Sequence, residues 1–131
     1  MEESVVRYRV LLVDDAPVVR EALRWVLEEG LDLVVVGEAG EGRIVQQLVT
    51  ESTPDIVILD IELPDTDGYA VAGWIKALPT PPLVLFLSVH SDAASRQRAL
   101  AAGGDSFVEK GAGWSPLIGE IRRLLAGRQL S

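Results

Sequence analysis

Five short runs of apolar residues recur along the chain, and stretches with the spacing of helix faces separate them. Four of the runs are almost continuous in Val, Ile and Leu, and the fifth is weaker. Continuous runs of this length are typical of strands that are buried on both faces of a sheet. The predicted strands cover residues 8–13, 31–36, 55–59, 83–87 and 106–108.

Between these runs, amphipathic stretches predict five helices. Pro17 suits the first turn of the first helix, Gly30 ends it, and Asp67 is a candidate N-cap for the third. The helices are expected from residue 17 to the stop at 30, over 41–50, from the cap at 67 to the prolines at 79–82, over 92–102, and around 117–125.

Strict alternation of strand and helix predicts the fold class: an α/β, doubly wound, five-stranded parallel sheet with helices on both faces. The 131 residues suit one domain with a single core. Right-handed crossovers leave few possible topologies for such a chain.

Polar residues fall at the ends of the predicted strands. Asp14 and Asp15 follow the first strand, Asp60 the third, Ser88 the fourth and Lys110 the fifth. In an open parallel sheet these ends share one edge, where ligands bind. Singly, each residue has an ordinary explanation as a turn, a cap or a surface group. Their common position is what predicts one site.

Three carboxylates in one crevice favour a divalent cation. The chain has no cysteine and a single histidine, His90, so the available ligands are oxygens and favour Mg²⁺ or Mn²⁺ over Zn²⁺. A carboxylate can also act as a nucleophile that forms aspartyl phosphate. Lys110 and the Ser88 hydroxyl could then hold phosphoryl oxygens.

The overall charge narrows the possible partners. Twelve Lys and Arg against 20 Asp and Glu give a net charge of −8, so direct nucleic-acid binding by residues 1–131 is not expected. No apolar run approaches the length of a membrane helix, and the N-terminus lacks a signal-peptide pattern. These features, with the lack of cysteine, fit a cytoplasmic protein without a membrane partner.

From about residue 8 to residue 126, the chain resembles the receiver domain of bacterial response regulators. The matching stretches, in order, are LLVDDAPVVREALRWVLE, PDIVILDIELPDTDGYAVAGWIK, VLFLSVHSD and AAGGDSFVEKGA. The resemblance implies a flavodoxin-like (βα)5 fold with strand order 2-1-3-4-5. It also implies a phosphoacceptor protein in two-component signalling that is not itself an enzyme with a turned-over substrate.

The resemblance assigns roles to the acidic residues. Asp60 is implied as the phosphoacceptor for a sensor histidine kinase, and Asp15 as the direct Mg²⁺ ligand, with Mn²⁺ as a substitute. Asp14 would help through water or orientation, and the backbone carbonyl of Glu62 would complete the protein ligands, beside Asp60 itself. The Glu62 side chain adds negative charge beside the site.

Three further residues are implied in transmitting the switch. Lys110 would contact the phosphate, and Ser88 would be the switch hydroxyl, at a position where Thr is frequent. Phe107 would be the aromatic residue that turns inward after the switch, without the hydroxyl that a Tyr would offer.

The last stretch, SPLIGEIRRLLAGRQLS, resembles the final helix and early linker of the NarL/FixJ-type subfamily. We therefore expect a receiver domain over residues 1–126 and, over 127–131, the start of a linker to a helix-turn-helix output domain. Phosphorylation would favour a homodimer, either through residues 92–126 or through the first and fifth helices, which would use Trp25. Trp25, Trp74 and Trp114 are each expected to be partly buried with one edge exposed.

Two other functions remain open from the residues alone. Asp60-Ile61-Glu62 superficially resembles the nucleophile motif of haloacid-dehalogenase-type phosphohydrolases, although that motif normally lies on the first strand. The second possible function is that of an interaction module with the receiver fold that works without phosphorylation. Turnover of a phosphate ester would indicate the first, and failure to bind Mg²⁺ the second.

Overall fold

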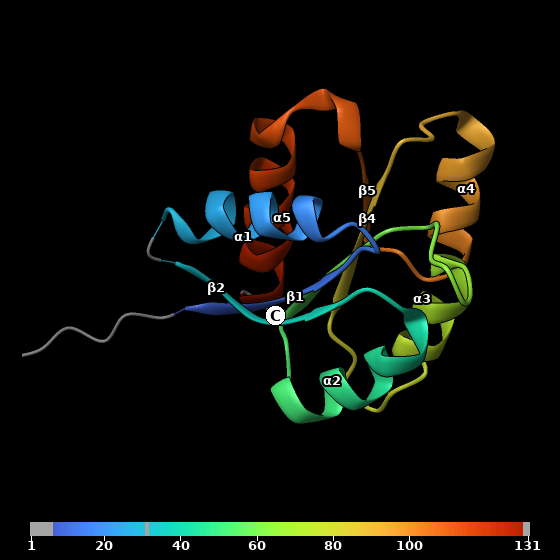
Figure 1. Ribbon diagram of the computed structural model, residues 1–131, viewed down its shortest axis with the longest axis horizontal. Helices are drawn as coiled ribbons and strands as arrows, with labels where there is room; N and C mark the ends of the chain where they lie inside the picture. Colours follow the sequence, from blue (N-terminus) through green and yellow to red (C-terminus); the bar gives the residue numbers. More distant parts are fainter. Residues whose placement is uncertain (1–6, 31, 130–131) are drawn as a thin grey trace, which may run out of the picture.

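A five-stranded parallel sheet forms the centre of the structure, a computed structural model that describes residues 7–30 and 32–129 (Figure 1). The strands lie in the order β2-β1-β3-β4-β5, and every neighbouring pair is parallel. The predicted fold class and strand order are thus confirmed. The strands are β1 Tyr8–Val13, β2 Leu33–Ala39, β3 Ile56–Leu59, β4 Leu83–Ser88 and β5 Ser106–Glu109.

Helices cover both faces of the sheet (Figure 1). Helices α1 (Pro17–Glu28) and α5 (Trp114–Gln129) pack on one face. Helices α2 (Val45–Ser52), α3 (Gly68–Lys76) and α4 (Ala93–Ala101) lie on the other.

The core is divided into two apolar clusters, one on each side of the sheet, and the central strands supply both. Leu11 and Val13 of β1 belong to the cluster under α2 and α3. Val10 and Leu12 belong to the cluster under α1 and α5. Successive side chains of a strand point to opposite faces, so a strand covered on both sides must be continuously apolar.

The predicted bounds of the second strand are wrong. The strand was expected over residues 31–36, but β2 runs from Leu33 to Ala39, and Leu31 lies outside the described residues. A bulge shifts the register, since Val10 pairs with Val35 while the next residue of β1 pairs with Gly37. Pairing with β1 then continues through Gly37 and Glu38 to Ala39. Because neither Gly37 nor Glu38 has an apolar side chain, the hydrophobic pattern does not indicate where the strand ends.

The helix ends follow local chemistry. The Asp67 carboxylate accepts a hydrogen bond of 2.8 Å from the Ala70 amide, so the predicted cap of α3 is confirmed. The second helix was expected over 41–50, but a 3₁₀ turn at Gly42–Ile44 precedes α2, which runs on to Ser52.

At the carboxyl end, α5 continues to Gln129, so residues 127–129 of the expected linker are helical. Residues 130 and 131 lie outside the described part of the chain. The division into domains therefore stays a prediction.

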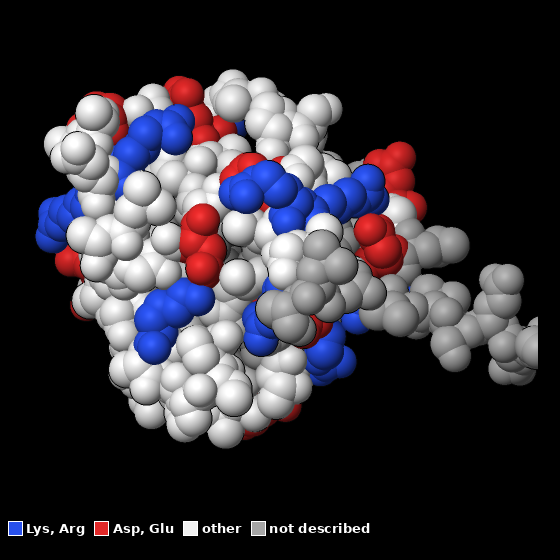
Figure 2. All heavy atoms as spheres, turned by 180° about the vertical axis from the view of Figure 1, so that it is seen from behind, with Lys and Arg blue, Asp and Glu red and all other residues white. Residues whose placement is uncertain are grey.

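The exposure of the three tryptophans differs in part from the prediction. Trp25 is 78% exposed, so the prediction of partial burial is wrong for it, whereas Trp74 is partly buried and Trp114 is 43% exposed. Trp25 is exposed because α1 packs on the sheet through Leu23 and Leu27, which leaves Trp25 outside the buried face of the helix. On the face seen in Figure 2, Lys and Arg side chains lie beside Asp and Glu side chains.

Within residues 7–30 and 32–129, no helix combines the length and apolar character needed to cross a membrane.

Candidate functional site

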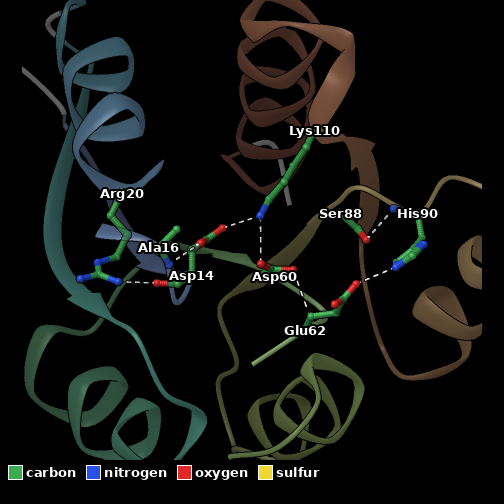
Figure 3. Close-up of polar contacts among 8 residues, drawn as sticks. All are labelled: Asp14, Ala16, Arg20, Asp60, Glu62, Ser88, His90 and Lys110. Carbon is green, nitrogen blue, oxygen red and sulfur yellow. Dashed lines mark hydrogen bonds and ion pairs between the residues drawn. The ribbon is translucent and has the colours of Figure 1, made fainter. Parts of the chain in front are cut away.

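The carboxyl edge of the sheet brings together polar residues at the ends of β1, β3, β4 and β5 (Figure 3). Asp14 follows β1, Asp60 follows β3, Ser88 ends β4, and Lys110 follows β5. Backbone hydrogen bonds extend the pairing by one residue, because the Asp14 amide donates to Ala39 and the Asp60 amide donates to Val13, each at 2.9 Å. The sheet therefore fixes the backbone from which the Asp14 and Asp60 side chains project.

Lys110 connects two of the acids. Its Nζ lies 2.8 Å from Asp14 Oδ2 and 2.9 Å from Asp60 Oδ2. The contact with Asp60 has hydrogen-bond geometry, whereas the contact with Asp14 is an ion pair only. Asp14 Oδ2 is buried and accepts no hydrogen bond within the described residues.

Local hydrogen bonds fix the other carboxylate oxygens. Asp14 Oδ1 accepts from the Ala16 amide at 2.9 Å, and Asp60 Oδ1 accepts from the Glu62 amide at 3.1 Å. The loop after Asp60 folds back tightly, so a Cβ on Gly68 would come within 2.3 Å of the Asp60 carbonyl oxygen. Only glycine fits at that position without moving the backbone of the site.

Burial and charge oppose each other at this site. Burial raises the pKa of Asp60 above its ordinary value, and Asp14 adds to the rise, although Lys110 and the Glu62 amide counter it. Burial alone would lower the pKa of Lys110, but the carboxylates of Asp14 and Asp60 outweigh it, so the pKa of Lys110 is raised. One ammonium therefore serves two acids that are only 2% and 7% exposed.

A third carboxylate completes an acidic cluster. Ligand oxygens of Asp14, Asp15 and Asp60 all lie within 4.8 Å of one another, and Asp15 is the exposed member. With all three ionised beside Lys110, the cluster carries a charge of −2. The oxygen ligands, the excess negative charge and the buried Asp14 Oδ2, which accepts no hydrogen bond within the described residues, together fit a hard divalent cation such as Mg²⁺.

The other predicted site residues lie around this cluster. Ser88 is buried, and its hydroxyl accepts a hydrogen bond of 3.1 Å from the His90 amide. Phe107 on β5 already lies inward and is 8% exposed, with the Arg96 guanidinium 4.8 Å from its ring centre. The exposed Glu62 side chain lies 2.6 Å from the His90 ring, a pairing across two loops that the sequence did not predict.

Sequence reasoning also missed Arg20. Its guanidinium donates to the backbone carbonyl of Asp14 and, at 3.1 Å, to Glu38 of β2. In the sequence, Arg20 is only a polar residue of an amphipathic helix. The one available signal was its distance of six residues from Asp14.

Fold and site together define a class: doubly wound α/β proteins with an acidic site at the switch point of the sheet. The response regulator receiver domain family matches residues 10–122 of this chain, so the chain belongs to that family.

Similar proteins include regulators that are longer than this chain. The transcriptional activator protein ExaE of Pseudomonas putida is 37% identical over 118 residues, which are 90% of this chain and 55% of that protein. A protein-glutamate methylesterase/protein-glutamine glutaminase of Symbiobacterium thermophilum is 40% identical over 80% of this chain and 29% of that protein.

Among solved structures, a LuxR-family two-component response regulator from Aurantimonas sp. SI85-9A1 has a TM-score of 0.87 and 33% identity. The match covers 92% of this chain and 86% of that one. The chain thus spans a little over half of curated relatives such as ExaE and most of this crystallised regulator.

Proposed function

We propose that this receiver domain is a signalling switch that accepts a phosphoryl group on Asp60 from a sensor histidine kinase. The observation that carries the proposal is the shared ammonium, because Lys110 contacts both Asp14 and Asp60 at the edge where β1, β3 and β5 end. This is the arrangement needed to hold an anionic phosphoryl group beside a carboxylate nucleophile.

In the proposed reaction, an Asp60 carboxylate oxygen forms a bond to phosphorus as the bond between phosphorus and the donor breaks. The bonding electron pair leaves with the donor, which is the imidazole nitrogen of the kinase histidine. Asp60 Oδ1 is held by the Glu62 amide and Oδ2 by Lys110, so the carboxylate is oriented before the donor arrives.

The proposed cation ligands are the carboxylates of Asp14, Asp15 and Asp60 and the backbone carbonyl of Glu62. Bound Mg²⁺ or Mn²⁺ would neutralise the negative charge that gathers when a phosphoryl group meets a carboxylate. Asp15 is the proposed main ligand, because it is the exposed acid of the three and so stays accessible to a hydrated ion.

Lys110, Ser88 and Phe107 are proposed to transmit the switch. A phosphoryl group on Asp60 would give Lys110 and the Ser88 hydroxyl new oxygens to bind, which biases the loop after β4 between two arrangements. The Phe107 ring packs against the Arg96 guanidinium of α4, so its position would change together with the loop after β4. Lys110→Ala should leave some phosphorylation but uncouple it from the conformational change.

The proposed output runs through protein contacts and controls transcription through a C-terminal helix-turn-helix domain. ExaE, a similar protein, is a transcriptional activator, which supports this choice. Phosphorylation makes the acidic receiver still more negative, so residues 1–131 are not expected to bind DNA themselves. Homodimerisation is proposed through residues 92–126 or, alternatively, through α1 and α5.

The main test is covalent modification by acetyl phosphate with Mg²⁺, followed by intact-mass spectrometry. One phosphoryl group should be added to the wild type and none to Asp60→Asn, because the amide is a poor nucleophile. Asp32→Asn, before β2 at the opposite edge of the sheet, is the matched control and should be modified like the wild type. Undiminished modification of Asp60→Asn would overturn the assignment.

The same samples test the rest of the proposal. Sedimentation with and without beryllofluoride, a phosphoryl mimic, should show self-association on activation, and a DNA shift assay should show no binding. Continuous turnover of a generic phosphate ester would instead indicate a phosphohydrolase. A wild type that neither binds Mg²⁺ nor accepts phosphate would indicate a phosphorylation-independent module.

A further inference from the structure

Arg20 of α1 connects the acidic site to the edge strand β2. Its side chain is largely buried, at 18% exposure. Nη1 donates to the backbone carbonyl of Asp14, and Nε donates to Glu38 Oε1 at 3.1 Å. Figure 3 shows the guanidinium pointing to Asp14 from the side away from Lys110.

The guanidinium is itself held in place. Glu38 Oε2 accepts from Nε and Nη2 of Arg24 at 2.9 and 2.7 Å, so one carboxylate ties two arginines of α1 to β2. Burial would raise the pKa of Glu38, but Arg24 and Arg20 lower it by more, so this carboxylate stays ionised. A Cβ on Gly40 would lie 3.2 Å from Arg20 Nη1, so a side chain at this position would crowd the guanidinium.

The carbonyl that Arg20 holds belongs to the peptide unit between Asp14 and Asp15. A peptide unit is planar, so the direction of this carbonyl sets the path by which the chain enters Asp15. The Asp14 amide is fixed by Ala39 and the Asp14 side chain by Ala16. Asp15, the exposed acid, depends most directly on the orientation of this peptide.

We infer that Arg20 is a positioning residue for the cation site, because its bridge from Glu38 to the Asp14 carbonyl holds the Asp14–Asp15 peptide so that three carboxylates converge. The inference rests on the proposed function, since it takes the acidic cluster to be a Mg²⁺ site. Arg20 does not touch the cation in this assignment and acts through the backbone.

The direction in which Mg²⁺ affinity changes when Arg20 is removed distinguishes a positioning role from a purely electrostatic one. A positive charge near a cation site weakens cation binding, so removing a guanidinium that acted only through its charge would tighten Mg²⁺ binding. Removing a guanidinium that holds the peptide should weaken Mg²⁺ binding instead. The loss should be on the order of tenfold, the usual size for an outer partner of a metal site.

The experiment is a calorimetric Mg²⁺ titration of the wild type, Arg20→Ala and Arg24→Ala, with thermal melts of each. Arg24 is the matched control because it lies on the same helix and binds the same Glu38, whereas its hydrogen bonds and ion pairs go to Glu38 and Glu28 and not to Asp14. Both variants remove one positive charge and the hydrogen bonds of one arginine to Glu38 of β2. Only Arg20→Ala is expected to bind Mg²⁺ more weakly, while Arg24→Ala should match the wild type or bind slightly more tightly.

Arg20→Lys keeps the test decisive if Arg20→Ala does not fold. Lysine preserves the charge but lacks the planar fork that reaches Glu38 and the carbonyl together, so its Mg²⁺ affinity should also fall. Mg²⁺ binding as tight as in the wild type by a folded Arg20→Ala or by Arg20→Lys would overturn the inference and leave the proposed function intact. A wild type that binds no Mg²⁺ would overturn the proposed function itself.

Discussion

Two groups of carboxylates in this molecule have opposite surroundings. Glu38 and Glu120 are supplied with donors: Glu38 binds two arginines, and Glu120 binds Arg123 at 2.7 Å and the Ser106 hydroxyl. Arg123 and Ser106 hold the pKa of Glu120 at about 2, well below its usual range. At the carboxyl edge of the sheet, one ammonium is shared by two buried acids.

The comparison separates carboxylates that stabilise the fold from carboxylates placed for binding. A lowered pKa means that the folded protein favours the ionised form, as at Glu38 and Glu120. The raised pKa of Asp60 means that the folded protein disfavours its charge. The protein therefore retains a deficit of positive charge at the edge where a cation and a phosphoryl group are proposed to bind.

The largest effect on stability is expected for Lys110→Ala. This change leaves Asp14 and Asp60 without their ammonium, and loss of one partner of a buried ion pair costs about 3 kcal/mol of unfolding free energy. Urea unfolding at neutral pH should show the loss, and saturating Mg²⁺ should recover part of it by supplying the missing positive charge. Arg43→Ala, which removes an exposed ion pair with Glu41, is the control and should have little effect.

In the wild type, the contribution of Lys110 has a defined pH range. Its pKa is higher in the folded than in the unfolded protein, so its stabilisation is fully present below the ordinary lysine pKa and disappears as the pH rises through the folded value. A Lys110→Ala protein as stable as the wild type at neutral pH would show that the two acids are not paired through this ammonium.

A smaller loss is expected for Glu120→Gln, on the order of 1 kcal/mol, because the pair with Arg123 is largely exposed. The pKa of Glu120 is lowered from 4.5 to about 2, so its stabilisation is present above pH 4.5 and is lost as the pH falls towards 2. The difference between variant and wild type in thermal unfolding should therefore shrink across that range. A constant difference from pH 7 to pH 2 would contradict the assignment.

The sequence predicted the fold closely where burial on both faces dictates the pattern. The bounds of β1 were predicted correctly, because its alternate residues enter two different apolar clusters. The end of β2 was not predicted, since Gly37 and Glu38 continue the pairing after a bulge without an apolar signal. Periodicity records burial, and it does not record backbone pairing at the edge of a sheet.

The same limit applies to the site. The acids and Lys110 were predicted to converge because parallel strands end at one edge, and the structure brings Asp14, Asp15, Asp60 and Lys110 together. The bridge from Arg20 to Glu38 spans 18 residues and depends on the distance between α1 and β2, which no spacing in the sequence encodes. The chemical roles assigned to Asp14, Asp15, Asp60 and Lys110 remain predictions.

Removal of a site carboxylate should have the opposite sign to removal of Glu120. At neutral pH, Asp60→Asn should raise the thermal midpoint by roughly 2–4 °C, which corresponds to less than about 1 kcal/mol. The pKa of Asp60 is higher in the folded protein, so its ionisation opposes folding once the pH rises through that value, and no such penalty exists below the ordinary Asp pKa. The gain should therefore fade in acid, and a lower midpoint at pH 7 would contradict it.

The smallest effect on folding, together with a large effect on binding, is expected for Asp15→Asn. Asp15 is the exposed acid of the cluster, so loss of its charge should leave the metal-free thermal midpoint unchanged or slightly raised by relief of carboxylate repulsion. Mg²⁺ affinity should fall by at least tenfold, because the proposed main ligand is lost. Calorimetric titration beside thermal melts measures both quantities on one sample. A midpoint that collapses while Mg²⁺ affinity is unchanged would move Asp15 into the group of carboxylates that stabilise the fold, and would contradict its assignment as a cation ligand.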